Sequence, residues 1–339
     1  MEGLRSRLGI AAPPFTKGPY TWDQFVTFSG GIAGANVTGN IIYVDGTNGS
    51  DSNSGHSWGE AKATIQGGVT AAGANGVVYV NPKLITDLTG DPTNYAETII
   101  IPVTHTGLSL IGINRGRTQG GLPQIKIGTG TTAMITVRAA GCLIANMGFN
   151  GTGSTGGGIL LDDDYATKIA FGTSIINCHF KNCKGHATTA SLGGAIMWSD
   201  QGNAWQVYIG GNRFYKNVCD ICLKGTSSTR PQDVIIEHNH FAAGATSSTC
   251  IWGGGSGFGD GFVVYNNTFG NVPSLGSGSE RYFCGLGNDL NGTGIMSNNT
   301  FGAAGTITGY GANKATAKIG TGILLSNNYS SAGLIVREA

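Results

Sequence analysis

Two similar segments of the chain end in carboxylates that could act together. The segment 158-GILLDDD-164 can be placed over 195-AIMWSDQ-201 at an offset of 37 residues, so that Asp163 meets Asp200. On neighbouring strands of a parallel sheet, these carboxylates would lie roughly 5 Å apart. A retaining glycosidase uses two carboxylates at about this separation, and their repulsion raises the pKa of one of them. Asp163 and Asp200 are therefore the candidate catalytic pair.

Aromatic residues accompany these carboxylates. The same offset places Leu161 against Trp198, and Trp205 follows shortly after it. Exposed aromatic rings beside carboxylates suit the binding of sugars, so Trp198 and Trp205 are the candidate glycan-binding residues. The alternative is a solvated acidic turn in which neither carboxylate has a partner. Both interpretations depend on the secondary-structure elements that align the two segments.

The cysteines are the candidate ligands of a metal centre. The chain has seven cysteines, among them Cys219 and Cys222 in a CxxC motif, with Cys178 and Cys183 one repeat earlier. A zinc site would need these four thiolates to converge. Since successive side chains of a strand point to opposite faces, small buried and reduced thiols are the favoured interpretation. We expect neither a metal nor a cofactor.

A repeated phrase indicates which elements position these residues. The segments 262-FVVYNNTFGN-271 and 295-IMSNNTFGAA-304 share an Asn pair and a phenylalanine, and looser copies occur elsewhere in the chain. The recurring aromatic residues are Phe149, Phe180, Phe214, Phe241, Phe269 and Phe301, with gaps of 31, 34, 27, 28 and 32 residues. Repeats of this length, built from short Ile- and Val-rich runs between Gly, Asn and Ser, indicate a solenoid of strands.

The Asn pair has a physical explanation in such a solenoid. Successive turns stack at roughly 4.8 Å, so each residue lies against its equivalent on the next turn. Asn tolerates left-handed backbone, and stacked Asn side chains can hydrogen-bond in a ladder. The phenylalanine would point inward and stack in the core. The last copy departs from this pattern, because Tyr329 follows its Asn pair directly.

Composition supports a folded chain with many tight turns. Of 339 residues, 59 are glycine and 40% are hydrophobic. The formal net charge is only +1, and the Lys and Arg residues are scattered along the sequence, so nucleic acid is not an expected partner. No apolar run reaches the ~18 residues of a membrane span, so a membrane is not expected either.

The region before the repeats predicts a cap. Residues 41–82 contain a strand, a helical segment with Ile65, Val69 and Ala72 on one face, and a second strand. A solenoid needs such a cap to cover its open end. Gly67 and Gly68 each weaken the helix by roughly 1 kcal/mol, so its stability should depend on docking. We expect the cap at 41–82 and a parallel β-helix at 83–339.

Residues 1–40 form a segment of different character. Its aromatic residues are Phe15, Tyr20, Trp22, Phe25 and Phe28. Dense aromatic residues on a terminal arm suit docking to another protein, and the alternative is that the arm folds back over the cap. The first ten residues lack the long apolar core of a secretory signal, so we expect synthesis in the cytoplasm.

The cap and first coils resemble a known superfamily. The similarity lies in 41-IIYVDGTNGSDSNSGHSW-58, 61-AKATIQGGVTAA-72, 77-VVYVNP-82, 95-YAETIII-101 and 108-LSLIGINRG-116. They are similar to the pectate-lyase-like right-handed parallel β-helix superfamily, and the resemblance covers about residues 41–330. It implies an all-β fold, a right-handed parallel β-helix with a short N-terminal helix cap. Pectin lyases, polygalacturonases, phage tailspikes and adhesins share this fold, so the fold does not decide the function.

The signatures of the superfamily's enzymes are missing from this chain. Gly185-His186 is followed by Ala, no Arg-x-Lys motif occurs, and no partnering Arg is evident beside Asp162, Asp163 and Asp164. We therefore expect glycan binding without cleavage. The enzyme alternative is a polysaccharide lyase or glycoside hydrolase.

A β-helix that follows a short aromatic arm resembles the appendages of phage virions. We expect a tailspike-like protein on the virion surface, made in the host cytoplasm, whose arm binds other virion proteins and whose coil meets host surface polysaccharide. Such proteins are usually homotrimers, and this is the oligomer expected. A purely structural capsid decoration protein is the third alternative.

Overall fold

The computed structural model describes most of the chain from residue 39 onward. The described residues are 39–83, 94–113, 121–127, 130, 132–152, 156–161, 170–185, 193–199, 204–224, 231–243, 249–253, 260–271, 284–286, 293–302, 317–319, 322–330 and 333–334. They belong to the second of two compact units, which spans Val37–Ala339. The predicted anchoring residues Phe15, Tyr20, Trp22, Phe25 and Phe28 lie outside the described residues.

The described strands form three long sheets. The ten-stranded sheet contains β1 (Ile41–Val44), β2 (Val77–Val80), β4 (Ser109–Gly112), β7 (Leu143–Ala145), β10 (Ser174–Ile176), β13 (Tyr208–Gly210), β16 (Ile235–Glu237), β19 (Phe262–Tyr265), β22 (Gly294–Ser297) and β25 (Ile323–Ser326). The nine-stranded sheet contains β5 (Gln124–Ile125), β8 (Gly148–Asn150), β11 (His179–Lys181), β14 (Arg213–Tyr215), β17 (His240–Ala243), β20 (Thr268–Asn271), β23 (Thr300–Phe301), β26 (Tyr329–Ser330) and β27 (Gly333–Leu334). The eight-stranded sheet contains β3 (Ile99–Ile101), β6 (Ile135–Val137), β9 (Ile159–Leu161), β12 (Ile196–Trp198), β15 (Cys219–Leu223), β18 (Thr249–Gly253), β21 (Cys284–Leu286) and β24 (Ala317–Ile319).

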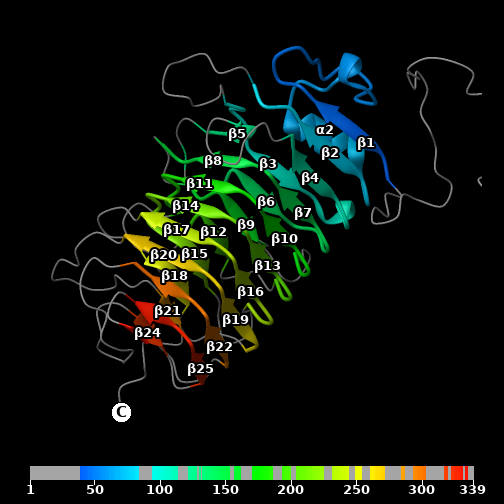
Figure 1. The fold of residues 1–339 in the computed structure, drawn as a ribbon. Helices are drawn as coiled ribbons and strands as arrows, with labels where there is room; N and C mark the ends of the chain where they lie inside the picture. The colour runs from blue at the N-terminus through cyan, green and yellow to red at the C-terminus, as the bar shows by residue number, and fades with distance from the viewer. Residues whose placement is uncertain are drawn as a thin grey trace, which may run out of the picture. The chain divides into compact units, whose positions relative to one another are not determined.

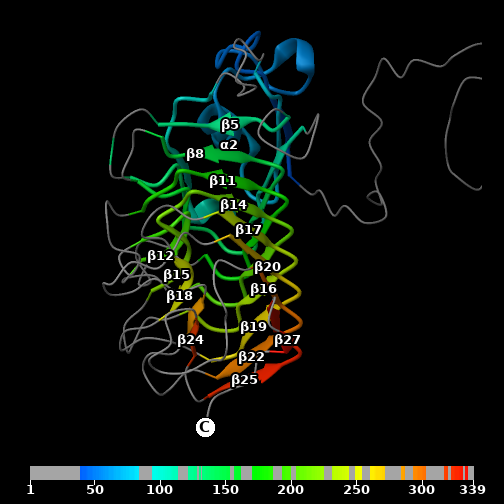
Figure 2. The same ribbon diagram turned by 60° about the vertical axis from the view of Figure 1, so that its left-hand side comes forward.

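From β4 to β24, each turn of the coil contributes one strand to each sheet. The chain passes from β7 to β8 to β9 and then returns to β10, which pairs in parallel with β7 (Figures 1 and 2). The same order repeats along the molecule, and the exception to parallel pairing among the described strands is β26 with β27. The predicted fold class, an all-β right-handed parallel β-helix with a short N-terminal helix, is confirmed.

One of the corners between sheets has a constant length. From β7 onward, two residues separate each strand of the ten-stranded sheet from the following strand of the nine-stranded sheet. This two-residue corner holds the repeated Asn pair. The other two corners vary in length, which explains the irregular gaps between repeats.

The phenylalanines form the predicted interior stack. Register pairs Phe180 with Phe149 and with Phe214, and the pattern continues to Phe241, Phe269 and Phe301. Neighbouring rings lie 4.6–5.1 Å apart between centroids and are within 10° of parallel. All six rings are at most 2% exposed. The stack ends because the register places Ser330 on Phe301, and the departing residue Tyr329 points outward, 50% exposed.

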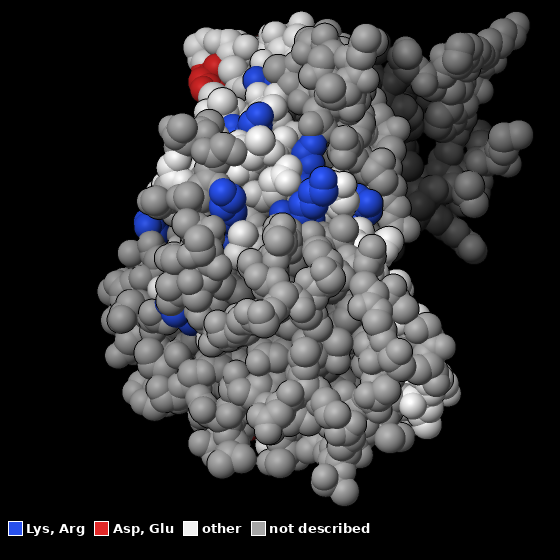
Figure 3. All heavy atoms as spheres, turned by 90° about the vertical axis from the view of Figure 1, so that its left-hand side faces the viewer, with Lys and Arg blue, Asp and Glu red and all other residues white. Residues whose placement is uncertain are grey.

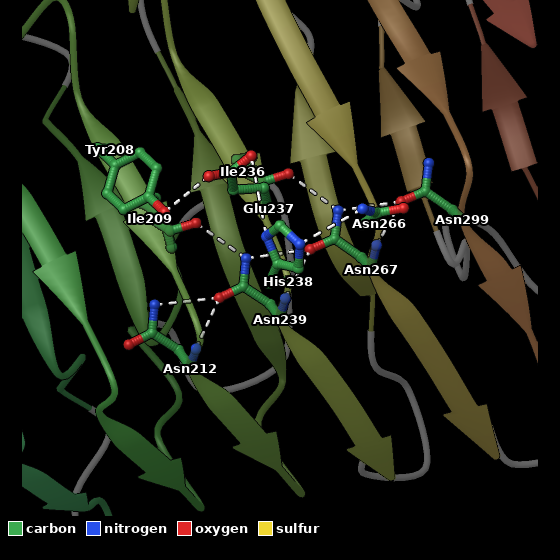
Figure 4. A network of polar contacts seen from close by, with 10 residues as sticks. All are labelled: Tyr208, Ile209, Asn212, Ile236, Glu237, His238, Asn239, Asn266, Asn267 and Asn299. Atoms are coloured by element: carbon green, nitrogen blue, oxygen red, sulfur yellow. Dashed lines mark hydrogen bonds and ion pairs between the residues drawn. The ribbon is translucent and has the colours of Figure 1, made fainter.

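The second Asn of each pair forms a buried ladder along the coil (Figure 4). The Nδ2 of Asn267 donates to Oδ1 of Asn299 at 3.0 Å, and its Oδ1 accepts from Nδ2 of Asn239 at 3.1 Å. Each ladder Oδ1 also accepts a backbone N–H from the preceding turn, and each Nδ2 also donates to a carbonyl there. The full ladder is Asn212, Asn239, Asn267, Asn299 and Asn328, all at most 2% exposed.

The first Asn of each pair provides the bend. Asn266, Asn298 and Asn327 have φ of 52°, 55° and 51°, in the left-handed region. Asn accepts this conformation more readily than most residues, because its short side chain can hydrogen-bond locally. Where the pair is imperfect, Gly211 and His238 take the same position with φ of 67° and 55°. The two Asn residues therefore have different roles, although the sequence repeats them as a pair.

The strand β1, the helix α2 and the strand β2 come first among the described elements, and the boundaries of the cap stay a prediction. The helix α2 (Ile65–Ala72) buries Ile65, Gly68, Val69 and Ala72, and β1 and β2 begin the ten-stranded sheet. A Cβ at Gly68 would lie 2.5 Å from Val44, so this glycine lets the helix lie close to the sheet. Glu97 accepts the backbone N–H groups of Ile65 and Gln66 at the first turn of α2. No helix in the described part of the chain is long and apolar enough to cross a membrane.

The two roles within the Asn pair predict opposite responses to one substitution. Asn267→Gly removes a ladder amide and leaves buried partners on both neighbouring turns unpaired, at about 1–3 kcal/mol for each group. We expect a loss of at least about 2 kcal/mol in the free energy of unfolding. Asn266→Gly keeps the left-handed backbone, which glycine adopts readily, and should cost less than about 1 kcal/mol. Urea unfolding followed by circular dichroism measures both, and equal losses would contradict the assignment.

Candidate functional site

The predicted offset between the two acidic segments is correct. The strands β9 and β12 pair in parallel with Ile159 against Ile196, Leu160 against Met197 and Leu161 against Trp198. This is the 37-residue offset on which the alignment of Asp163 with Asp200 was based. Both carboxylates lie outside the described residues, so the catalytic pair stays a prediction.

The expectation that Trp198 is an exposed sugar-binding ring is wrong. Its side chain is 2% exposed and belongs to the main hydrophobic core. Side chains alternate along a strand, so Trp198 points to the same side as the fully buried Ile196. Its indole N–H donates to the carbonyl of Ala204 at 2.9 Å, which satisfies the ring's polar atom inside the protein. Trp198 presents no face to a ligand in this structure.

Trp205 is exposed, as expected, and has an aromatic neighbour on the preceding turn. Trp205 is 43% exposed and Phe171 is 42% exposed. Trp205 precedes Gln206, and Phe171 precedes Gly172. Gln206 and Gly172 both have left-handed backbone, at the corner that leads into the ten-stranded sheet. The N–H of Gly172 donates to the carbonyl of Trp205 at 2.8 Å, which ties the two turns together. Phe171 was not predicted, because only the stacking of turns makes it a neighbour of Trp205.

A polar cluster lies on the outer face of the same sheet, with Tyr208 at the start of β13 and Glu237 at the end of β16 (Figure 4). The hydroxyl of Tyr208 donates to Oε1 of Glu237 at 2.8 Å, one turn further along the coil. His238 Nδ1 lies 3.9 Å from the other carboxylate oxygen, and His238 Nε2 is 3.3 Å from the amide nitrogen of Asn266. The side chain of His238 is 58% exposed and that of Glu237 is 27% exposed. The cluster thus offers a carboxylate and an imidazole to solvent.

A glycine allows this cluster to form. Register places Gly210 opposite Glu237, and a Cβ at Gly210 would lie 2.5 Å from the Tyr208 hydroxyl. The phenol of Tyr208 therefore lies over Gly210 on its way to the carboxylate. Burial, together with the hydrogen bond and charge of Glu237, raises the pKa of Tyr208 to about 12. Tyr208 accordingly remains a hydrogen-bond donor at all ordinary pH values.

The outer face of the ten-stranded sheet presents hydrogen-bonding groups and aromatic rings. Its three central strands, β13, β16 and β19, carry the single carboxylate Glu237. Acid–base cleavage of a glycosidic bond needs a second carboxylate on the other side of the bond. Hydrogen-bonding groups and aromatic rings, by contrast, recur along the face from Trp205 to Tyr208 to Tyr265. Glu237 and His238 were not predicted from the sequence, because the resemblance between turns concerns the buried positions beside them.

The cysteines do not form a site in the described part of the chain. Six described cysteines are free and buried. Burial raises the pKa of Cys142, Cys178 and Cys183 to about 12, and raises that of Cys219 as well. Within the described ranges, no three His, Cys, Asp or Glu side chains are placed to hold a metal ion.

Asp220 is a carboxyl group buried between two turns. It is 4% exposed, and its Oδ1 accepts a hydrogen bond from Nδ2 of Asn217 at 2.8 Å. Burial raises the pKa of Asp220 to about 8, although the hydrogen bonds from Asn217 and Cys250 oppose the shift. Folding therefore favours the neutral acid at this position.

Comparison with known proteins identifies no family for this chain. Neither a protein-family model nor a curated protein matches the sequence significantly. One similar solved structure is PfbA, a surface adhesin of Streptococcus pneumoniae, with 15% identity, 76% of this chain and 78% of that chain covered, and a TM-score of 0.39. Another is a rhamnogalacturonan lyase, with 14% identity, 86% and 87% covered, and a TM-score of 0.35. Similarities this low assign neither a family nor a function.

Asp220 predicts a pH-dependent stability. Its folded-state pKa of about 8 lies above the ordinary 3.8, so the folded chain holds one proton more than the unfolded chain between these values. The contribution of Asp220 to the free energy of unfolding is fully present below pH ~4. It falls by about 1.4 kcal/mol per pH unit up to pH ~8. Asp220→Asn should remove this loss, so the free energy of unfolding of the variant should rise relative to that of the wild type as pH increases. Urea unfolding from pH 4 to 8 measures the difference.

The control for this prediction is Asp260→Asn, at an exposed turn. It should retain the wild-type pH profile. Parallel profiles for Asp220→Asn and the wild type would show that the buried carboxyl does not carry the effect.

Proposed function

We propose that the chain binds a polysaccharide on the outer face of the ten-stranded sheet. The observation that carries this proposal is the exposed pair Phe171 and Trp205 on neighbouring turns, with Trp205 three residues before Tyr208, the first residue of β13. Aromatic faces pack against the C–H groups of sugar rings, while the hydroxyl groups of the sugar need hydrogen-bond partners. Glu237, His238 and Asn266 offer such partners at the other end of the same face.

The geometry of the coil suits a polymer better than a single sugar. Equivalent positions recur on successive turns at about 4.8 Å, so one ligand with repeated units can meet several similar contacts. Weak contacts that recur along one ligand add to a useful affinity. A polysaccharide is therefore a better match to this face than a small molecule.

We propose binding without cleavage at this face. Glu237 is the carboxylate of its central strands, and no second acid accompanies it there. Cleavage at Asp163 and Asp200 is the competing hypothesis, and it requires its own experiment.

The biological setting that we propose is a phage virion, in which the chain is a tailspike-like appendage. The aromatic arm at residues 15–28 supplies a segment suited to docking on another virion protein. The six free, buried cysteines are compatible with assembly in a reducing cytoplasm. In this setting the bound polysaccharide is that of the host surface.

A homotrimer is the proposed assembly. The outer face of the ten-stranded sheet carries an apolar row toward its C-terminal end. In this row Ile235 is 38%, Ile295 37% and Leu324 70% exposed. Exposed apolar rows of this kind are removed from water when equivalent subunits pack about a symmetry axis. Ile235 lies on β16 beside Glu237, whereas Ile295 and Leu324 lie on β22 and β25, beyond the strands that carry the proposed glycan-binding residues. We therefore place the contact between subunits on Ile295 and Leu324.

The glycan proposal predicts the effect of removing two rings. Trp205→Ala and Phe171→Ala should each weaken binding to host polysaccharide about tenfold, since one stacked ring contributes roughly 1–2 kcal/mol. Tyr329→Ala is the matched control, because Tyr329 is 50% exposed but lies on β26 of the nine-stranded sheet. Glycan arrays and calorimetry with purified polysaccharide measure the affinities. Equal losses for all three variants would refute the site.

The same samples distinguish binding from cleavage. If the chain only binds, polysaccharide incubated with the wild type gains no new reducing or unsaturated ends. New ends that disappear in Asp163→Asn or Asp200→Asn would replace the binding proposal with that of a hydrolase or lyase. Unaffected attachment in every aromatic variant would favour a structural decoration protein.

The virion proposal predicts the location and mass of the native protein. Mass spectrometry of purified particles should detect its peptides, and a chain that starts at residue 40 should remain β-rich but fail to join particles. Light scattering should give three times the 34.7 kDa of one chain. Particles without the protein, or normal incorporation of the shortened chain, would contradict the setting or the role of the arm.

A further inference from the structure

The outer face of the nine-stranded sheet holds two cations around one aromatic ring. The guanidinium carbon of Arg213 lies 5.4 Å from the ring centroid of Tyr215, and the Nζ of Lys216 lies 5.1 Å from the same centroid. Arg213 and Tyr215 flank the inward-pointing Phe214, so both point outward. This cluster lies on a different sheet from the glycan-binding face proposed above.

A buried histidine holds the arginine in place. Nη1 of Arg213 lies 3.1 Å from Nε2 of His179, which is the register neighbour of Arg213 on the preceding turn. Arginine has no acceptor, so it donates and His179 Nε2 accepts. His179 is 2% exposed and therefore fixed by its surroundings. A guanidinium held at one end presents its remaining donors in a constant direction, which suits a planar carboxylate.

Lys216 occupies a position that is costly for lysine. Its φ is 55°, in the left-handed region, where side chains other than Asn and Gly are strained. The equivalent residue on the preceding turn is Asn182, with φ of 54°. An asparagine would therefore satisfy the fold at residue 216. Strain of this kind accumulates at functional positions, and here it accompanies a positive charge beside Arg213.

The described strands of the surrounding face carry the same sign of charge. The described strands β5, β8, β11, β14, β17 and β20 contain no Asp or Glu. Figure 3 looks onto the side of the coil at the left of Figure 1, and Lys and Arg atoms gather over its described part, with Asp and Glu atoms at one upper edge. Although Lys and Arg are scattered along the sequence, the stacking of turns brings several of them to one side of the coil.

We propose that Arg213, Tyr215 and Lys216 form a binding site for an acidic sugar. The carboxylate of the sugar binds the guanidinium of Arg213 and the ammonium of Lys216. Tyr215 between them supplies a phenol for hydrogen bonding. Naming a sugar as the carrier of the anion rests on the proposed function, whereas the anion site itself does not. The ligand class is thus a polysaccharide with negatively charged units, and the site lies apart from Trp205.

Calorimetry with defined oligosaccharides tests the site in the full-length protein. The probes are a glucuronic acid oligomer, a neutral glucose oligomer of the same length, a sulfated oligomer, inorganic phosphate and a DNA oligonucleotide of matched charge. We expect the acidic oligomers to bind more tightly than the neutral one, with an affinity that falls as salt is raised. Arg213→Gln should weaken acidic-oligomer binding about tenfold, as expected for one charged hydrogen bond.

Lys216→Asn separates binding from folding. It relieves the left-handed strain, so the melting temperature should stay constant or rise while affinity for the acidic oligomer falls severalfold. Lys62→Gln, at the cap, is the matched control and should bind as the wild type does. Loss of affinity with a lower melting temperature, an equal loss in Lys62→Gln, or tighter binding of DNA or free phosphate than of the acidic oligomers would overturn the proposal.

The two glycan proposals can fail independently. If Arg213→Gln and Lys216→Asn bind all probes as the wild type does while Trp205→Ala loses host polysaccharide, the acidic-sugar site is wrong and the proposed function stands. If the acidic oligomers depend on Arg213 but Trp205→Ala changes nothing, the anion site is supported and the aromatic face is not.

Discussion

The stacking of each residue on its own equivalent is the constraint on which this structure depends. In a parallel coil, the same position recurs about 4.8 Å away on the next turn, so each side chain must pack against its own equivalent. Few side chains accept this, because like charges repel and irregular shapes leave voids. Phe241 between Phe214 and Phe269 satisfies it with near-parallel rings. Asn267 between Asn239 and Asn299 satisfies it with an amide that donates on one side and accepts on the other.

The Asn ladder also explains how a polar row can lie inside the coil. An amide in water and an amide in this ladder make similar numbers of hydrogen bonds, so burial costs little as long as the row is complete. Replacing one of these asparagines by aspartate would introduce a negative charge and remove the two N–H donors of its amide. Asp220 shows what a buried carboxyl requires elsewhere in the coil, namely a raised pKa and a neighbouring amide from Asn217. The Asn ladder and Asp220 are thus buried together with their hydrogen-bond partners.

The interior of the molecule could be predicted from sequence, because it repeats. The six stacked phenylalanines, the Asn ladder and the pairing of Leu161 with Trp198 all follow from comparing one segment of the chain with another. The exterior does not repeat, so the comparison fails there. Tyr208 and Glu237 lie 29 residues apart and share no motif, and only the register between turns brings them together. The error at Trp198 has a different origin: the offset was right, but the alternation of side chains along β12 was not followed.

The two-residue corner between the ten- and nine-stranded sheets has a consequence for how such a chain can change. Because that corner has a constant length, it fixes the phase of every turn, and the other two corners are free to lengthen or shorten. An insertion at a variable corner alters a loop and leaves the strands on either side in register. A whole turn, cut from one Asn pair to the next, is a unit that can be duplicated or deleted without changing its neighbours' contacts. The coil is in this sense a modular scaffold, in which new surface loops can be grafted and the reach of the molecule adjusted while the interior stays the same.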